Sequence, residues 1–144
     1  MYERILVPTD GSDYSDRAAD HAMELAAQFG AAVDALFVVE EAGPNGHWDL
    51  AVEKQEAAGE QALDSVAAMG DERGLQIERH LRRGKPAAEV VDAAADYGVD
   101  LIVMGTQGRT GFSRIASAGS TTERVVRLTE IPTLVVGGAG ARKE

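Results

Sequence analysis

The residues best suited to chemistry lie in one glycine-rich segment, residues 105–120. It holds four glycines, several serine and threonine hydroxyls, and the arginines Arg109 and Arg114. Glycine lets backbone N–H groups approach a ligand closely, and arginine adds positive charge. Gly119 and Ser120 stand just before a predicted helix, whose first turn is a favourable position for an anion. The segment therefore predicts a phosphate-binding site.

The distribution of charge supports this prediction. The chain of 144 residues carries 24 acidic and 14 basic side chains, a net charge of −10. Residues 101–122 nevertheless contain no Asp or Glu, and no other acid-free stretch of the sequence is as long. The alternative is a solvent-exposed loop whose glycines only form turns. Because the segment directly follows a buried strand, where ligands of parallel sheets bind, phosphate binding is favoured.

A second candidate position is the turn Pro8–Ser12, which follows the first predicted strand. Asp10 could accept a hydrogen bond from a ribose hydroxyl or hold Mg²⁺ through water. Alternatively, its carboxylate bonds the backbone amides of the turn itself. Free main-chain groups at Val38–Glu40, where the second predicted strand ends, could pair with the edge of an adenine base.

The motifs of nucleotide-hydrolysing enzymes are missing. No phosphate-binding loop with an invariant lysine is present, and no G-x-G-x-x-G follows the first strand. No residue is an obvious base to activate water. The sequence therefore supports binding without turnover and indicates no catalytic residue.

Other polar residues receive structural interpretations. His21, His47 and His80 lie far apart in the sequence, without the helical spacing of a metal site. Ser12 suits a helix cap better than a nucleophile, because no G-x-S-x-G motif accompanies it. The basic residues near the end of the third predicted strand are expected to be solvated; they are Arg82, Arg83 and Lys85.

The elements that must position these residues alternate along the chain. Apolar runs predict strands near 5–7, 32–39, 75–81, 101–104 and 131–136, and helical spacing predicts helices over 13–29, 48–73, 86–97 and 120–129. Phe29 and Tyr97 are expected in the core, and Gly59 should weaken its helix unless something packs closely there. This alternation predicts one α/β domain, a parallel sheet with helices on both faces.

Composition excludes several classes of protein. The chain has no cysteine, which rules out disulfides, thiolate metal sites and cysteine nucleophiles and suits the cytoplasm. Neither a signal peptide nor an apolar run of about 20 residues is visible, so no membrane association is expected. The negative charge disfavours nucleic acid as a partner. We expect one domain over residues 1–144 with a frayed tail at about 138–144.

Five stretches together resemble the universal stress protein family: residues 4–12, 84–90, 100–111, 119–127 and 131–136. The resemblance covers residues 3–137. It implies an open, twisted, Rossmann-like parallel sheet of five strands in the order 3-2-1-4-5, and usually a homodimer that pairs through the last strand. The ATP-binding members share a G-x-x-G motif and a later G-[S/T] pair, matched by Gly105, Gly108, Gly119 and Ser120. The spacer 109–118 is one residue longer than in that pattern, and Gln107 stands where His is frequent.

The leading hypothesis is thus an ATP-binding regulatory or stress-response protein with little or no hydrolysis. The alternatives are a nucleotide-free dimeric interaction module of the same fold and a slow ATPase. The resemblance makes ATP the expected ligand. Any Mg²⁺ is expected near Asp10 through the nucleotide, and no metal site made of protein side chains is expected. The predicted nucleotide-binding residues are Pro8, Thr9, Asp10, Val38, Met104, Gly105, Gly108, Arg109, Gly119, Ser120 and Thr121.

Overall fold

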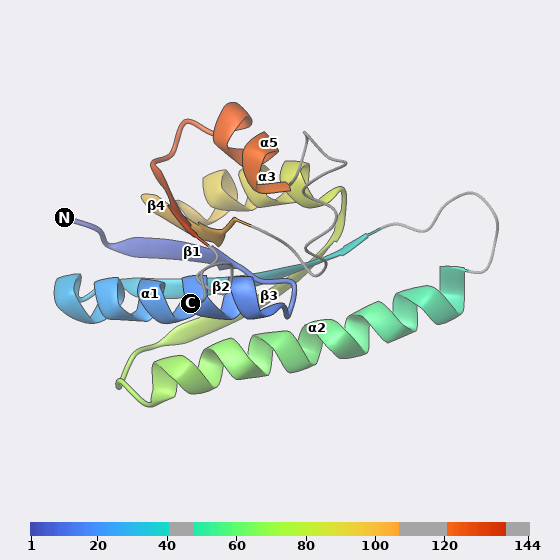
Figure 1. Cartoon of the computed structure of the whole chain (residues 1–144), viewed down its shortest axis with the longest axis horizontal. Helices are drawn as coiled ribbons and strands as arrows, with labels where there is room; N and C mark the ends of the chain where they lie inside the picture. The colour runs from blue at the N-terminus through green and yellow to red at the C-terminus, as the bar shows by residue number, and fades with distance from the viewer. Residues whose placement is uncertain (41–47, 107–120, 138–144) are drawn as a thin grey trace, which may run out of the picture.

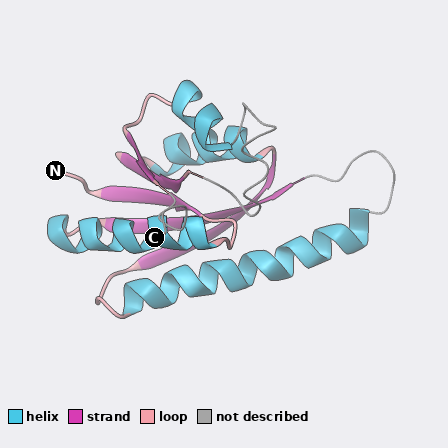
Figure 2. Ribbon diagram, viewed as in Figure 1, coloured by secondary structure: helices cyan, strands magenta, loops and turns pink. Residues whose placement is uncertain are grey.

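The computed structural model describes residues 1–40, 48–106 and 121–137, which form one parallel sheet between two layers of helices (Figures 1 and 2). The strands occur in the predicted order β3-β2-β1-β4-β5. In chain order the elements are β1 (Arg4–Pro8), α1 (Asp13–Phe29), β2 (Ala32–Glu40), α2 (Trp48–Asp71), β3 (Ile77–Gly84), α3 (Pro86–Tyr97), β4 (Leu101–Gly105), α5 (Thr121–Leu128) and β5 (Thr133–Val136).

The two faces of the sheet are covered by different helices. Figure 1 shows α1 and α2 on one side and α3 and α5 on the other. Side chains alternate between these faces along each strand: on β1, Ile5 and Val7 pack with α1 and α2, whereas Leu6 packs with α3 and α5. Both faces are apolar, as expected for a parallel sheet buried on both sides.

The ends of the helices follow the predicted local chemistry. Ser12 caps α1, since its hydroxyl accepts a hydrogen bond from the Ser15 N–H at 3.2 Å. Gly30 and Gly98 end α1 and α3 with φ near +68°, in the left-handed region that favours glycine. These sequence signals are therefore confirmed.

Gly59 has a packing role within α2. A Cβ atom at this position would lie 2.6 Å from the Phe37 ring, which is itself buried in the core. The helix can approach β2 this closely only because residue 59 has no side chain. The cost of glycine in a helix is offset here by contact with an aromatic ring.

Two predictions about single residues are wrong. Phe29 is 43 % exposed rather than in the core, because it is the last residue of α1 and packs only edge-on against Tyr2, with ring centroids 5.3 Å apart. Arg82 is paired rather than solvated, since its side chain is 23 % exposed and bonds Glu89 at 2.8 Å. Arg83 and Lys85 are exposed as expected, and Arg83 also forms an ion pair with Glu56 on α2. Tyr97 is partly buried and packs at the margin of the α3 side of the core, as expected.

Some element boundaries also differ from the prediction. Strand β3 starts at Ile77 rather than at residue 75 and continues to Gly84, because its pairing with β2 runs from Val33–Ile77 to Glu40–Gly84. Strand β5 starts at Thr133, since Pro132 lacks the N–H that a ladder needs. Among the described helices, none is both long and apolar enough to cross a membrane.

Candidate functional site

The candidate site lies where strands β1 and β4 end side by side. These strands are neighbours at the centre of the sheet, paired in register at Ile5–Leu101 and Leu6–Ile102. The chain leaves β1 toward α1 on one face and reaches β4 from α3 on the other. This reversal is the switch point at which open α/β sheets bind ligands. The two predicted binding segments, after Pro8 and after Met104, therefore start from adjacent strands.

The turn after β1 is held by its own side chains. The Thr9 hydroxyl is buried, accepts from the Gly11 N–H at 3.1 Å and lies 3.1 Å from the Ser15 hydroxyl. The carboxylate of Asp10 accepts from the Ser12 N–H at 2.9 Å. The turn-stabilising interpretation of Asp10 is thus correct for this oxygen atom. It also holds the carboxylate at the carboxyl end of β1.

The start of α1 is negatively charged. Burial raises the pKa of Asp16 above its ordinary value, and the nearby carboxylates of Asp13 and Asp10 raise it further. Several ionised groups here repel an anion. The start of α1 is therefore an unfavourable position for a phosphate group.

Strand β2 extends past its neighbour β1. Their pairing ends at Pro8–Leu36, and the Thr9 N–H donates to the Leu36 carbonyl at 2.8 Å. Residues two apart direct their main-chain groups to the same side of a parallel strand, so Val38 presents its N–H and C=O where β1 has already ended. This geometry suits the pairing with a base edge that the sequence predicts for Val38.

The same expectation is wrong for Glu40, whose main-chain groups are occupied. The side-chain amide of Gln55 on α2 accepts from the Glu40 N–H at 2.8 Å and donates to the Glu40 carbonyl at 3.1 Å. No sequence motif singles out Gln55. Its contact with Glu40 is visible only in the packing of α2 against the end of β2.

Gly105 at the end of β4 is tightly enclosed. A Cβ atom there would lie 2.6 Å from the backbone oxygen of Tyr14, in the first turn of α1. Its carbonyl accepts from the Thr122 hydroxyl at 2.6 Å, which connects β4 with the start of α5. Gly105 is therefore required for packing, whatever else it contacts. Tyr14 and Thr122 were not predicted, because neither residue belongs to a recognisable motif.

The remaining predicted site residues differ in their burial and in whether the structure describes them. Pro8 and Met104 are buried at the ends of their strands, and Met104 packs on the α3 and α5 side of the core. Thr121 is exposed at the first position of α5. Gly108, Arg109, Gly119 and Ser120 lie outside the described residues, so their contacts with a ligand remain predictions.

Topology and strand-end geometry place the protein in the Rossmann-like class of open α/β folds. The model of the universal stress protein family matches residues 1–137, and the chain belongs to this family. The chain is 42 % identical over 141 residues to universal stress protein MJ0531 of Methanocaldococcus jannaschii, covering 94 % of this chain and 82 % of that protein.

Solved structures agree with this assignment. The structure of MJ0577, from the same organism, superposes with a TM-score of 0.81 at 30 % identity and covers 100 % of this chain and 99 % of that one. A universal stress protein in complex with cAMP superposes with a TM-score of 0.76 at 26 % identity, covering 94 % and 97 % of the two chains. The predicted strand order and fold are thereby confirmed.

Proposed function

We propose that this protein binds an adenine nucleotide, with ATP as the expected ligand, at the carboxyl ends of β1 and β4. The observation that carries the proposal is the position of Val38, whose main chain extends past β1 next to the Asp10 turn. One N–H donor and one C=O acceptor on the same strand edge match the acceptor and donor atoms of an adenine edge. The relative solved with cAMP supports an adenine-containing ligand for this family.

In this arrangement Asp10 contacts the ribose, directly or through water on Mg²⁺. The phosphates extend toward the acid-free segment, where Gly108, Gly119 and Ser120 of the family pattern supply N–H and hydroxyl donors. The negative start of α1 favours the same direction. The sequence supplies no P-loop lysine and no obvious base, so we propose a binding and regulatory role in the stress response, with hydrolysis below about 1 s⁻¹, the low end for ordinary enzymes.

The test of this site is calorimetric titration of ATP and adenosine into wild type and three variants. Asp10→Asn keeps an oxygen that accepts from the Ser12 N–H but loses the charge, so both ligands should bind about five- to tenfold more weakly. Ser120→Ala should weaken ATP about tenfold or more and leave adenosine almost unchanged. Asp13→Asn is the matched control, because Asp13 is exposed in the same helical turn.

If neither ligand binds wild type, the nucleotide-free module is the better account of the chain. If Asp10→Asn binds both ligands as wild type does, the nucleotide lies elsewhere. ATP turnover well above about 1 s⁻¹ would instead favour the enzyme.

We also propose that the protein forms a homodimer through β5. This strand is an edge of the described sheet, and Val135 on it is 38 % exposed. An apolar edge strand favours pairing with a second copy. Val135→Lys should give a monomer in light scattering, and a monomeric wild type at tens of micromolar would contradict this proposal. We expect the protein to act in the cytoplasm, which suits a chain without cysteine.

A further inference from the structure

Strand β2 carries one charge in the middle of the core. Its residues are otherwise apolar between Ala32 and Val39, as a strand buried on both faces requires, but Asp34 interrupts the run and is 0 % exposed. A buried ion pair rarely stabilises a fold more than apolar residues of the same size would. The position of Asp34 therefore needs a reason other than stability.

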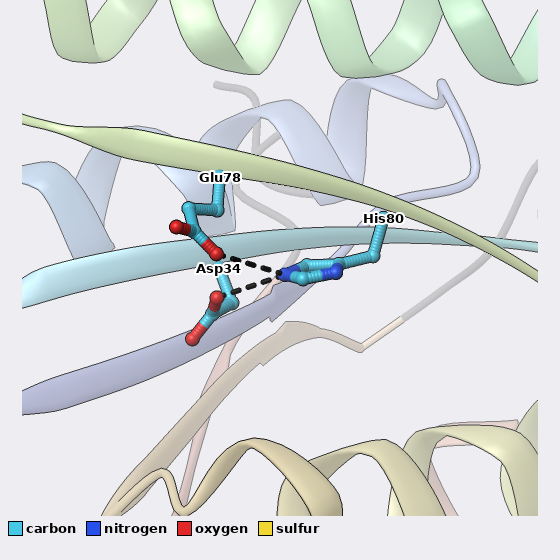
Figure 3. Close-up of side chains that lie close together, drawn as sticks. All are labelled: Asp34, Glu78 and His80. Atoms are coloured by element: carbon cyan, nitrogen blue, oxygen red, sulfur yellow. Dashed lines mark hydrogen bonds and ion pairs between the residues drawn. The ribbon is translucent and has the colours of Figure 1, made fainter.

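Asp34 belongs to a cluster on the α3 side of the sheet, which we call the Asp34 cluster: Arg4, Asp34, Glu78 and His80. Arg4 on β1 donates to both carboxylate oxygens, from Nη2 to Oδ1 at 2.7 Å and from Nε to Oδ2 at 3.0 Å. The Nε2 atom of His80 on β3 lies 2.9 Å from Asp34 Oδ1 and 3.9 Å from Glu78 Oε1 (Figure 3). Glu78 pairs with Asp34 in the strand register, so both side chains lie on one face.

This cluster is separate from the nucleotide site. Its residues lie in the first half of β1, β2 and β3, whereas the nucleotide site lies at the carboxyl ends of β1 and β4. The ring of His80 stacks on Tyr97, the last residue of α3, with centroids 4.1 Å apart. Because α3 returns antiparallel to the strands, its C-terminus reaches the end of the sheet opposite to the proposed nucleotide.

We infer that Asp34, Glu78 and His80 form a binding site for a divalent transition-metal ion of the zinc class. One nitrogen and two carboxylate oxygens from these residues lie within 4.8 Å of one another. Imidazole with carboxylate is a ligand set that Zn²⁺ and Co²⁺ accept, and three protein ligands leave a coordination position open. The sequence showed no such site because Glu78 and His80 lack helical metal-ligand spacing and Asp34 meets them only through the register of β2 and β3.

The surroundings of these ligands match a metal site. Arg4 holds the Asp34 carboxylate through Nε on Oδ2 and Nη2 on Oδ1, and Oδ1 also faces His80. Stacking on Tyr97 fixes the imidazole plane. Such outer contacts orient ligands before a metal ion binds. The Glu78 side chain is 68 % exposed, so it can adjust to complete the coordination.

Charge does not oppose a cation at this position. The guanidinium of Arg4 carries one positive charge and contacts both carboxylate oxygens of Asp34. With a neutral imidazole, the two carboxylates and Arg4 sum to −1, and a divalent ion replaces the contact between His80 and Asp34. Binding of Mg²⁺ distinguishes this site from a site for hard cations, because Mg²⁺ prefers an octahedral shell of oxygen and water ligands.

The test is titration of untagged, nucleotide-free protein with Zn²⁺ by calorimetry and with Co²⁺ by visible absorption. Wild type should bind one ion, and Mg²⁺ should not compete. His80→Ala should weaken Zn²⁺ binding by about tenfold to a hundredfold or more, and Glu78→Gln should weaken it less. His21→Ala is the matched control, since His21 is exposed on α1, which covers the other face of the sheet.

A second measurement keeps the inference testable if His80→Ala folds poorly. Arg4→Gln leaves Asp34 without its guanidinium, so Zn²⁺ should raise the unfolding temperature of this variant more than that of wild type. The inference is overturned if wild type gives no signal up to about 1 mM metal, or if His80→Ala binds Zn²⁺ as wild type does. The Asp34 cluster would then be only an ion-pair network that fastens β3 to β1.

Discussion

Gly105 offers a sharp test of how the site depends on the fold. In Gly105→Ala the new Cβ would lie 2.6 Å from the Tyr14 backbone oxygen and 2.9 Å from its carbonyl carbon. Backbone cannot rotate away as a side chain can, so the first turn of α1 must shift by several tenths of an ångström. Overpacking of this kind costs about 1–3 kcal/mol, which lowers the unfolding temperature by about 3–10 °C for a chain of this size.

The assay is urea unfolding of wild type, Gly105→Ala and the control Gly137→Ala. Residue 137 has no atom within 4 Å of an added Cβ and needs no positive φ, so its variant should stay within about 0.5 kcal/mol of wild type. The turn that carries Asp10 leads directly into the first turn of α1, so ATP affinity should fall in Gly105→Ala alone. Equal stability of the two variants would refute the reasoning.

Three further substitutions test local features. Asp16→Asn should stabilise the protein at pH 7, because burial and two neighbouring aspartates raise the pKa of Asp16 in the fold and its ionised form therefore costs stability. The gain measured by urea unfolding should shrink as the pH falls through the raised folded pKa and should vanish below the unfolded value of 3.8. A gain that grows on acidification would contradict this. Ser12→Ala should lower the free energy of unfolding by about 0.5–2 kcal/mol through the lost helix cap, and no change would count against the cap. Gly59→Ala should destabilise the protein in thermal unfolding despite the better helix propensity of alanine, because Phe37 has no room to move; a stabilised variant would disprove the contact.

The elements that the sequence predicted well are those with strong local signals. The apolar run of β4 and the capping residues of α1 and α3 depend on neighbours along the chain, and the structure reproduces them. The strand order 3-2-1-4-5 required the family resemblance, since alternation alone permits several orders.

The residues that the sequence did not predict depend on contacts between distant segments. Asp34 and His80 meet only through the register of β2 and β3, and Gln55 reaches Glu40 only through the packing of α2 on β2. Phe29 is a large apolar side chain, but it is the last residue of α1 and is 43 % exposed. The pattern of residues along the chain does not show which strand positions pair or where a helix packs on the sheet. These features therefore become visible only in the three-dimensional structure.

The position of the adenine ring in crystals grown with ATP tests the central claim most directly. We expect the edge of the adenine base to pair with the main-chain N–H and C=O of Val38. The ribose should lie near Asp10, and the phosphates should point away from the start of α1. A nucleotide bound elsewhere on the protein, or none at saturating ATP, would contradict it.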